Sequence, residues 1–170
     1  FAKNGSSFEN SPYASYNIAD TVYSIALTPK YVFLALGEKG IHSLNISTPH
    51  TITLIDTLTT TAAAPFTKVS CQDDLLSILA GPGGLITYFD YDVNFVKKLG
   101  TYQRGNDRFF DFAQDFNFFY VGIDTLGLQF LRMSSTNYSD QKNIFGLNLA
   151  VADSLSSFCV DDDRLYSFTL

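Results

Sequence analysis

The chain is poor in charge, and most of the charge that it carries is acidic. Only 16% of the 170 residues are Asp, Glu, Lys or Arg, against about a quarter in ordinary soluble domains. The 11 basic residues form no run longer than Lys97-Lys98, and the formal net charge is −6. Because a nucleic-acid-binding surface needs a dense basic footprint, the sequence predicts no nucleic-acid partner.

Long apolar runs are also missing. No run approaches the roughly 20 residues that a helix needs to cross a bilayer, so we expect no membrane span. Hydrophobic residues still make up 46% of the chain, which favours a folded domain with a sizeable core over disorder. Ser, Thr and Asn fill most polar positions. This composition is typical of secreted proteins, and we expect an extracellular or cell-surface location.

Metal-binding residues are scarce. The two histidines, His42 and His50, form no zinc framework. The segment 90–94 begins like an EF-hand calcium loop, but Phe95 and Thr101 stand where that loop requires Gly and Glu. The three aspartates at 161–163 fit a solvated hairpin turn better than a cation site. The sequence therefore predicts no metal site.

Catalytic motifs are absent as well. The chain contains no Gly-x-Ser-x-Gly elbow, and the glycine-rich stretch 81–84 lacks the Lys-Ser/Thr of a phosphate loop. Cys71 is expected on an inner strand, where burial disfavours a reactive thiolate. We therefore predict no catalytic residue and no cofactor.

What the chain does have is a repeat. Three Gly-apolar dipeptides begin at positions 40, 84 and 127, which are 44 and 43 residues apart, and each follows a short apolar or aromatic run. A period near 43 residues made of short strands is typical of β-propellers. We predict an all-β fold, an incomplete β-propeller of four-stranded antiparallel blades.

The first repeat reads as four strands: Val22–Leu27, Tyr31–Leu36, Ile41–Ile46 and Ile52–Leu58. Glycines 37 and 40 close a tight hairpin between the second and third strands. The same pattern predicts four strands in each of the next two repeats: Phe66–Cys71, Leu75–Ala80, Leu85–Phe89 and Phe95–Leu99 in the second, and Phe109–Ala113, Phe118–Ile123, Leu128–Met133 and Gln141–Phe145 in the third. No segment has the 3.6-residue period and the caps of a helix. The predicted organisation is a tail or last strand of a preceding blade at 1–17, then blades at 18–60, 61–103 and 104–146, and a partial blade at 147–170.

Propellers close with four to eight blades, and about three and a half are predicted here. We therefore expect a segment of a longer protein, with the missing blades supplied by the same or another chain. We expect blade interfaces to be filled by Phe33, Leu76, Phe119 and Tyr166.

The two cysteines, Cys71 and Cys159, are read as occupying matching places two repeats apart. Stacked blades would hold them further apart than the about 7 Å that a disulfide allows between Cα atoms. Two buried thiols, or a bond to another part of a longer chain, both remain open.

The repeat resembles that of the LVIVD family of β-propellers. Its first copy contains Tyr31-Val32-Phe33-Leu34-Ala35, followed by a glycine hairpin and by Gly40-Ile41-His42-Ser43-Leu44-Asn45-Ile46-Ser47-Thr48-Pro49. Asn45 stands where the family has Asp. The chain has no Trp, so WD40 repeats fit less well. The resemblance implies one blade per repeat, in surface or secreted proteins, and no single activity.

Three Asn-x-Ser/Thr triplets are glycosylation candidates, at Asn4, Asn45 and Asn137. Asn137 lies in a polar loop and Asn4 in a polar tail, whereas Asn45 lies near a strand end. If the protein is secreted, we expect Asn137 to carry an N-linked glycan.

These observations favour a non-catalytic interaction or structural module, part of a larger secreted or cell-surface protein or extracellular assembly. Its expected partner is another protein or a further copy of the chain. The alternative is a propeller enzyme, of hydrolase or lyase type, with its site in the central channel. Lys68 and Asp111 are the polar residues that the predicted inner strands offer to such a site.

Overall fold

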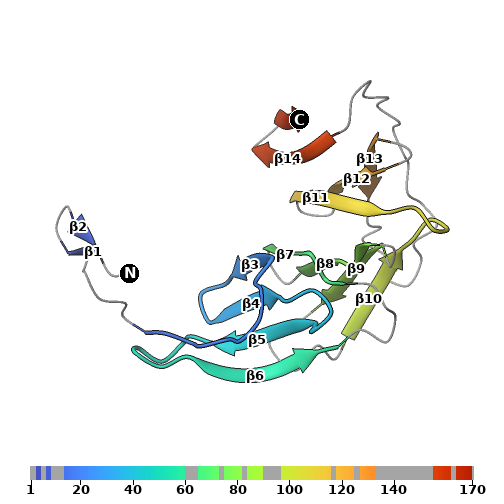
Figure 1. Ribbon diagram of the computed structural model, residues 1–170. Coiled ribbons are helices and arrows are strands. Elements are labelled where there is room, and N and C mark those ends of the chain that lie inside the picture. Colours follow the sequence, from blue (N-terminus) through green and yellow to red (C-terminus); the bar gives the residue numbers. More distant parts are fainter. Residues whose placement is uncertain are drawn as a thin grey trace.

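The structure is a computed structural model that describes residues 3–4, 7–8, 14–59, 65–72, 75–81, 84–89, 97–115, 118–124, 127–132, 155–161 and 164–169. All strands in these ranges pair antiparallel, and none of these residues is in an α-helix (Figure 1). The predicted all-β class is confirmed.

The first blade is a four-stranded sheet in the order β3-β4-β5-β6. The Thr28 hydroxyl oxygen accepts a hydrogen bond from the Tyr31 amide, at 2.9 Å, and turns the chain from the first strand into the second. The predicted glycine hairpin follows, and the Leu36 amide donates to the Gly40 carbonyl, at 2.9 Å. The strands are β3 (Ser24–Leu27), β4 (Tyr31–Ala35), β5 (Ile41–Asn45) and β6 (Thr53–Leu58).

The second blade repeats this arrangement. Its hairpin is closed in the same way, because the Ala80 amide donates to the Gly84 carbonyl, also at 2.9 Å. The inner strand begins at Lys68, two residues later than the predicted start at Phe66. The strands are β7 (Lys68–Gln72), β8 (Leu75–Leu79), β9 (Leu85–Phe89) and β10 (Lys97–Tyr102).

Two further sheets continue the array, one of three strands and one of two. The predicted outer strand 141–145 of the third blade lies outside the described residues. A separate two-stranded hairpin lies near the N-terminus. The strands are β11 (Phe109–Asp115), β12 (Phe118–Ile123), β13 (Gly127–Arg132), β14 (Leu155–Asp161), β15 (Arg164–Thr169), β1 (Lys3–Asn4) and β2 (Ser7–Phe8).

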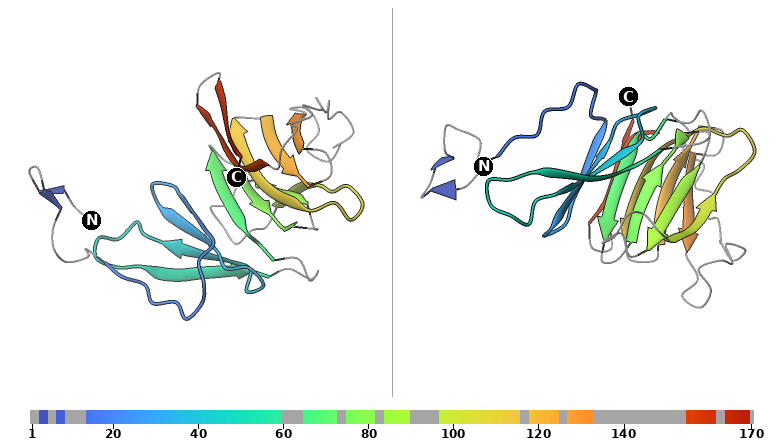
Figure 2. Two further views of the ribbon diagram at one scale, coloured as in Figure 1. Left: turned by 45° about the horizontal axis from the view of Figure 1, so that its top comes forward. Right: turned by 90° about the horizontal axis from the view of Figure 1, so that it is seen from below.

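The sheets stack face to face through their first strands. β3 contacts β7, β7 contacts β11, and β11 contacts β14, so these four form a row with β3 at one end and β14 at the other. Figure 2 shows the sheets fanning out from this row, with β6 at the outer edge of the first blade. A row of inner strands with blades radiating from it is the arrangement of a β-propeller.

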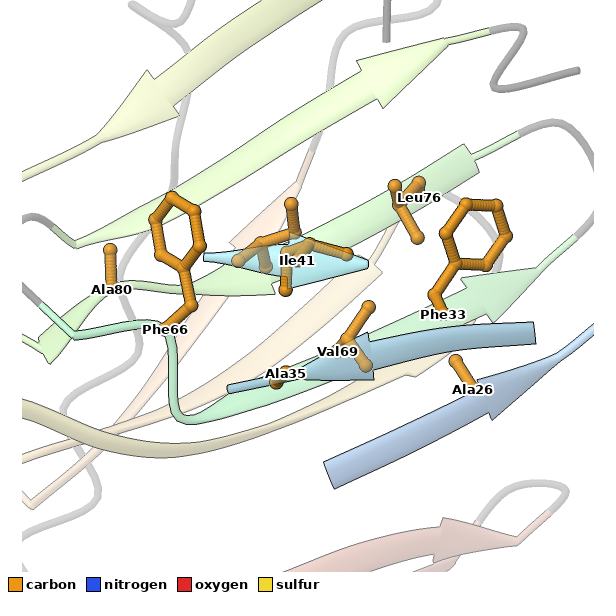
Figure 3. Packing of buried hydrophobic residues seen from close by; sticks show 9 residues of the cluster. Ala26, Phe33, Ala35, Ile41, Phe66, Val69, Leu76 and Ala80 are labelled. Atoms are coloured by element: carbon orange, nitrogen blue, oxygen red, sulfur yellow. The ribbon is translucent and has the colours of Figure 1, made fainter. Parts of the chain in front are cut away.

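The two largest clusters of buried apolar residues lie between blades. The first cluster joins blades one and two (Figure 3), and the second joins blades two and three. The first contains Ala26, Phe33, Ala35, Ile41, Phe66, Val69, Leu76, Ile78 and Ala80. The second contains Leu79, Phe109, Phe112, Phe119, Val121, Ile123 and Leu131.

The predicted interface residues Phe33, Leu76 and Phe119 are all buried in these clusters. They do not occupy equivalent places, however. Phe33 pairs with Ala26 and packs toward the next blade, whereas Leu76 and Phe119 pack toward the preceding one. The side chain of Tyr166, the fourth predicted residue, lies outside the described part.

Candidate functional site

The charged residues that the inner strands bring together are Lys68 of β7 and Asp111 of β11. The Lys68 Nζ donates to the Asp111 Oδ1 across the boundary between two blades. The same carboxylate oxygen accepts the backbone amide of Phe112, at 2.9 Å. The ammonium also lies over the Phe112 ring, with Nζ at 5.6 Å from its centroid.

This pair is only partly open to water. The Lys68 side chain is 32% exposed and that of Asp111 is 7% exposed. A carboxylate so far from solvent is stable when a cation and an amide replace its hydration, and both partners are present here. The charges therefore satisfy each other and hold β7 against β11.

A matching polar link joins the first two blades. The Val69 amide donates to Ser24 Oγ at 3.3 Å, and that hydroxyl donates to the Val69 carbonyl at 3.4 Å. Ser24, Lys68 and Asp111 lie 44 and 43 residues apart, so they occupy the same place in successive inner strands. One layer of the row is thus polar, and its contacts hold the blades together.

The sequence places Lys68 and Asp111 on predicted inner strands, but the strand pattern does not show that they form a pair. Their pairing is indicated by their separation of 43 residues, which equals the period of the repeat. Equivalent positions in adjacent blades lie side by side, so opposite charges one period apart form an ion pair.

Cys71 lies on the inner strand as predicted, but it is only partly buried. This partial burial raises the pKa of its thiol to about 12. A thiol that stays protonated is a poor nucleophile. The expectation that Cys159 occupies the matching place is wrong. Cys71 pairs with Leu76, five residues on, and the residue with that spacing in the fourth sheet is Val160, paired with Leu165. Cys159 therefore stands one residue before the matching position.

The histidines lie apart from each other. His42 is on β5, between Leu34 and Thr57 of the neighbouring strands, and its Nδ1 is buried without a hydrogen-bond partner. His50 lies in a turn with a left-handed φ of 62°. Within the described ranges, no three His, Cys, Asp or Glu residues are grouped as a metal ion requires. The segment 90–94 and residues 162–163 lie outside those ranges.

The three glycosylation candidates are differently placed. Asn45 ends β5 and is half-buried. Its Oδ1 accepts from the Ser47 amide at 2.8 Å and from the Ser47 hydroxyl at 2.6 Å. Asn4 is in β1, and Asn137 lies outside the described residues. The side-chain oxygen of Asn45 is thus held in a local turn.

The described part of the chain has no helix with the length and apolar character that crossing a membrane requires. No family model matches the sequence, and no curated protein matches it either.

Solved structures, in contrast, match well in shape. The chain is similar to the computationally designed Ika4 protein, with a TM-score of 0.70 and 10% identity over 95% of this chain and 93% of that chain. It is similar to a chain of the Mitotic Checkpoint Complex, with a TM-score of 0.65 and 16% identity over 98% of this chain and 52% of that one. It is also similar to U3-55K, with a TM-score of 0.63 and 8% identity over 89% and 46%.

The chain therefore spans about half the length of the last two proteins. At such low identities the likeness concerns the fold alone. Together with the stacked four-stranded sheets, it defines the class of this protein as an incomplete β-propeller.

Proposed function

We propose that this chain is a non-catalytic β-propeller module that serves interaction or structure. The observation that carries the proposal is that the two charged side chains brought together by the inner strands are paired with each other. Lys68 and Asp111 bind each other and a backbone amide, and thereby join two blades. The similarity to a chain of the Mitotic Checkpoint Complex, which is a protein assembly by its name, supports the same reading.

The finer proposal is that the module belongs to a larger secreted or cell-surface protein, or to an extracellular assembly. Its support is the low charge content, the abundance of Ser and Thr, and the resemblance of the first repeat to LVIVD propellers. The acidic net charge of −6 also argues against a nucleic-acid partner.

The mass of the native particle tests the interaction role. The protein is taken from its source under non-denaturing conditions and measured by size-exclusion chromatography with light scattering. We expect a particle clearly heavier than one polypeptide, whose mass denaturing mass spectrometry of the same material gives and which is at least the 18.9 kDa of these 170 residues. A lone particle with the mass of one polypeptide would contradict the proposal.

Glycan analysis tests the location. We propose that Asn137 carries an N-linked glycan in secreted material, and that Asn4 and Asn45 are further acceptors. Glycosidase treatment should lower the intact mass, and Asn137→Gln should remove most of that difference. An unchanged mass would count against secretion while leaving the interaction role intact.

The convergence of Lys68 and Asp111 is also the observation that favours the alternative, a hydrolase or lyase. The substitution Asp111→Asn, which keeps the volume of the side chain but removes its charge, distinguishes the two functions. An enzyme would lose turnover out of proportion to any loss of thermal stability, whereas a module would lose only stability. A measured turnover abolished in a stably folded Asp111→Asn chain would decide for the enzyme.

A further inference from the structure

One face of the first blade leaves an apolar stripe open to solvent. Tyr23, Ile25 and Leu27 alternate along the inner strand with residues that face the second blade, and Ile25 and Leu27 are 58% and 66% exposed. Further out on the same face, Leu34, Leu36 and Leu44 are covered by Tyr16 and Ile18 of the preceding segment. The uncovered part is therefore the inner-strand half of the face.

The second and third blades show what covers the equivalent face in a stacked blade. Ile25 pairs with Leu34 in the first blade, as Val69 pairs with Ile78 in the second and Phe112 with Val121 in the third. The equivalents of Ile25 are buried, with Val69 at 4% exposure and Phe112 at 0%. The exposed stripe thus occupies positions that, in both following blades, dock onto the blade before.

Within this chain, such a face is covered by the opposite face of another blade. Phe33, Ile41, Ala26 and Ala35 of the first blade cover Val69 and its neighbours, as Figure 3 shows. The occupant that fits the stripe is therefore the apolar face of a β-blade that carries an aromatic residue at the place of Phe33.

The other end of the row carries strands with that pattern. In the fourth sheet, Tyr166 pairs with Cys159 and Phe168 pairs with Ser157. These pairs have the spacing of Phe33 with Ala26 and of Ala35 with Ser24 in the first blade. By register, Tyr166 therefore occupies the position equivalent to Phe33.

β3 and β14 lie at opposite ends of the row of inner strands, so the described strands do not bring the two halves of this blade interface together (Figure 2). We propose that a second copy of this chain docks head to tail on the stripe, its β14–β15 sheet packing against Tyr23, Ile25 and Leu27. This inference rests on the proposed function and names the partner.

Such a contact is heterologous, because different surfaces of the two copies meet. It stabilises by removing apolar surface from water, and no charged residue is in the stripe, so high salt does not weaken it. Two copies that dock twice close a ring and leave no stripe exposed.

Sedimentation velocity of the purified 170-residue chain over a range of concentrations tests the proposal. We expect two or more copies per particle, and we expect Ile25→Lys to weaken the association by at least about tenfold, because the new ammonium would be buried without a partner. Ile25→Lys reduces the negative net charge, so its effect cannot come from repulsion between acidic copies. Since Ile25 is exposed, the variant should keep the circular dichroism of the original.

The matched control is Ile55→Lys, the same change at the bulged position of β6, away from the inner strand. It should leave the association unchanged. A mixing experiment tests the direction of docking. Ile25→Lys and Tyr166→Lys chains should each fail to associate alone, yet form dimers when mixed, because one intact interface remains.

A chain that stays monomeric at every concentration overturns the second copy as occupant. If the native particle is nevertheless heavier than one chain, the interaction role stands and the partner is a different protein. Association that Ile25→Lys leaves unchanged also overturns the proposal, since the stripe would then not be the contact.

Discussion

Lys68 and Asp111 hold two blades together with side chains that differ strongly in exposure. Lys68 keeps contact with water, whereas the carboxylate of Asp111 depends on its protein partners. Removing the cation leaves a buried carboxylate with less compensation, and removing both charges relieves that penalty. At the residue scale we therefore predict that the double variant loses less stability than the sum of the losses of the two single variants.

We expect Lys68→Met to lower the free energy of unfolding by about 2 kcal/mol. Adding Asp111→Asn should cost less than the sum of the two single changes, because the charge left unpaired is gone. Urea unfolding of the four chains measures this coupling. Lys39→Met, at an exposed hairpin position, is the control and should stay within about 0.5 kcal/mol. Strict additivity would show that the pair does not couple the blades.

Cys71 gives a second residue-scale prediction. Its thiol pKa is raised from an ordinary value of 9.0 to about 12 by burial, so at pH 8 the folded chain holds about a thousandfold less thiolate than the unfolded chain. In a Cys159→Ser background, a thiol reagent should therefore react far more slowly with the native protein than in denaturant. Equal rates would mean that the site is open.

The same pKa has a consequence for stability. The folded state keeps its proton where the unfolded state has lost it, so this contribution is constant below pH 9 and is lost as the pH rises from about 9 to 12. Cys71→Ala should flatten that part of the stability profile.

The glycines of the hairpins act at the scale of the element. Gly40 and Gly84 have left-handed φ values of 92° and 80°. A Cβ at either one would lie 2.0 Å from a backbone carbonyl oxygen, that of Leu58 or Tyr102, at the end of the fourth strand. Glycine is thus required at these positions for two reasons. The turn needs a left-handed φ, and the hairpin backbone lies too close to the outermost strand to leave room for a Cβ.

Gly84→Ala should cost at least about 3 kcal/mol or prevent folding, since it combines backbone strain with a clash against a backbone atom. Gly81→Ala separates the two causes. Gly81 also has a left-handed φ, of 51°, but a Cβ there would meet nothing within 4 Å. Its cost should be about 1 kcal/mol, from strain alone. Equal losses in thermal or chemical denaturation would rule out the close contact as the cause.

The elements themselves were largely predictable. The strands Leu85–Phe89 and Phe118–Ile123 have the predicted bounds, because short apolar runs between turn residues define them locally. Phe66 is different. It was expected to open the inner strand of the second blade, but it forms a separate bridge to Gly37 of the first, with both backbone bonds at 3.0 Å. Its partner belongs to another blade, which no local pattern indicates.

At the scale of the whole molecule, stability depends on contacts between blades, since each blade buries its faces on its neighbours. Phe119 is buried between the second and third blades. Phe119→Ala should lower the free energy of unfolding by about 3–5 kcal/mol. Leu54→Ala, at an exposed position of β6, should change it by no more than about 0.5 kcal/mol. A loss below 1 kcal/mol at Phe119 would contradict interface packing as the main source of stability.

The sequence by itself determined the period, the strands and the hairpins, because glycine conformation and apolar runs act over a few residues. The tertiary structure decided which face each side chain serves. Phe33 packs toward the next blade and Leu76 toward the preceding one, while Ile25 is left open. Both faces of a stacked blade are apolar, so alternation along a strand does not tell them apart. Only the position of the neighbouring blade separates a buried face from a docking surface, and it also brings Lys68 to Asp111.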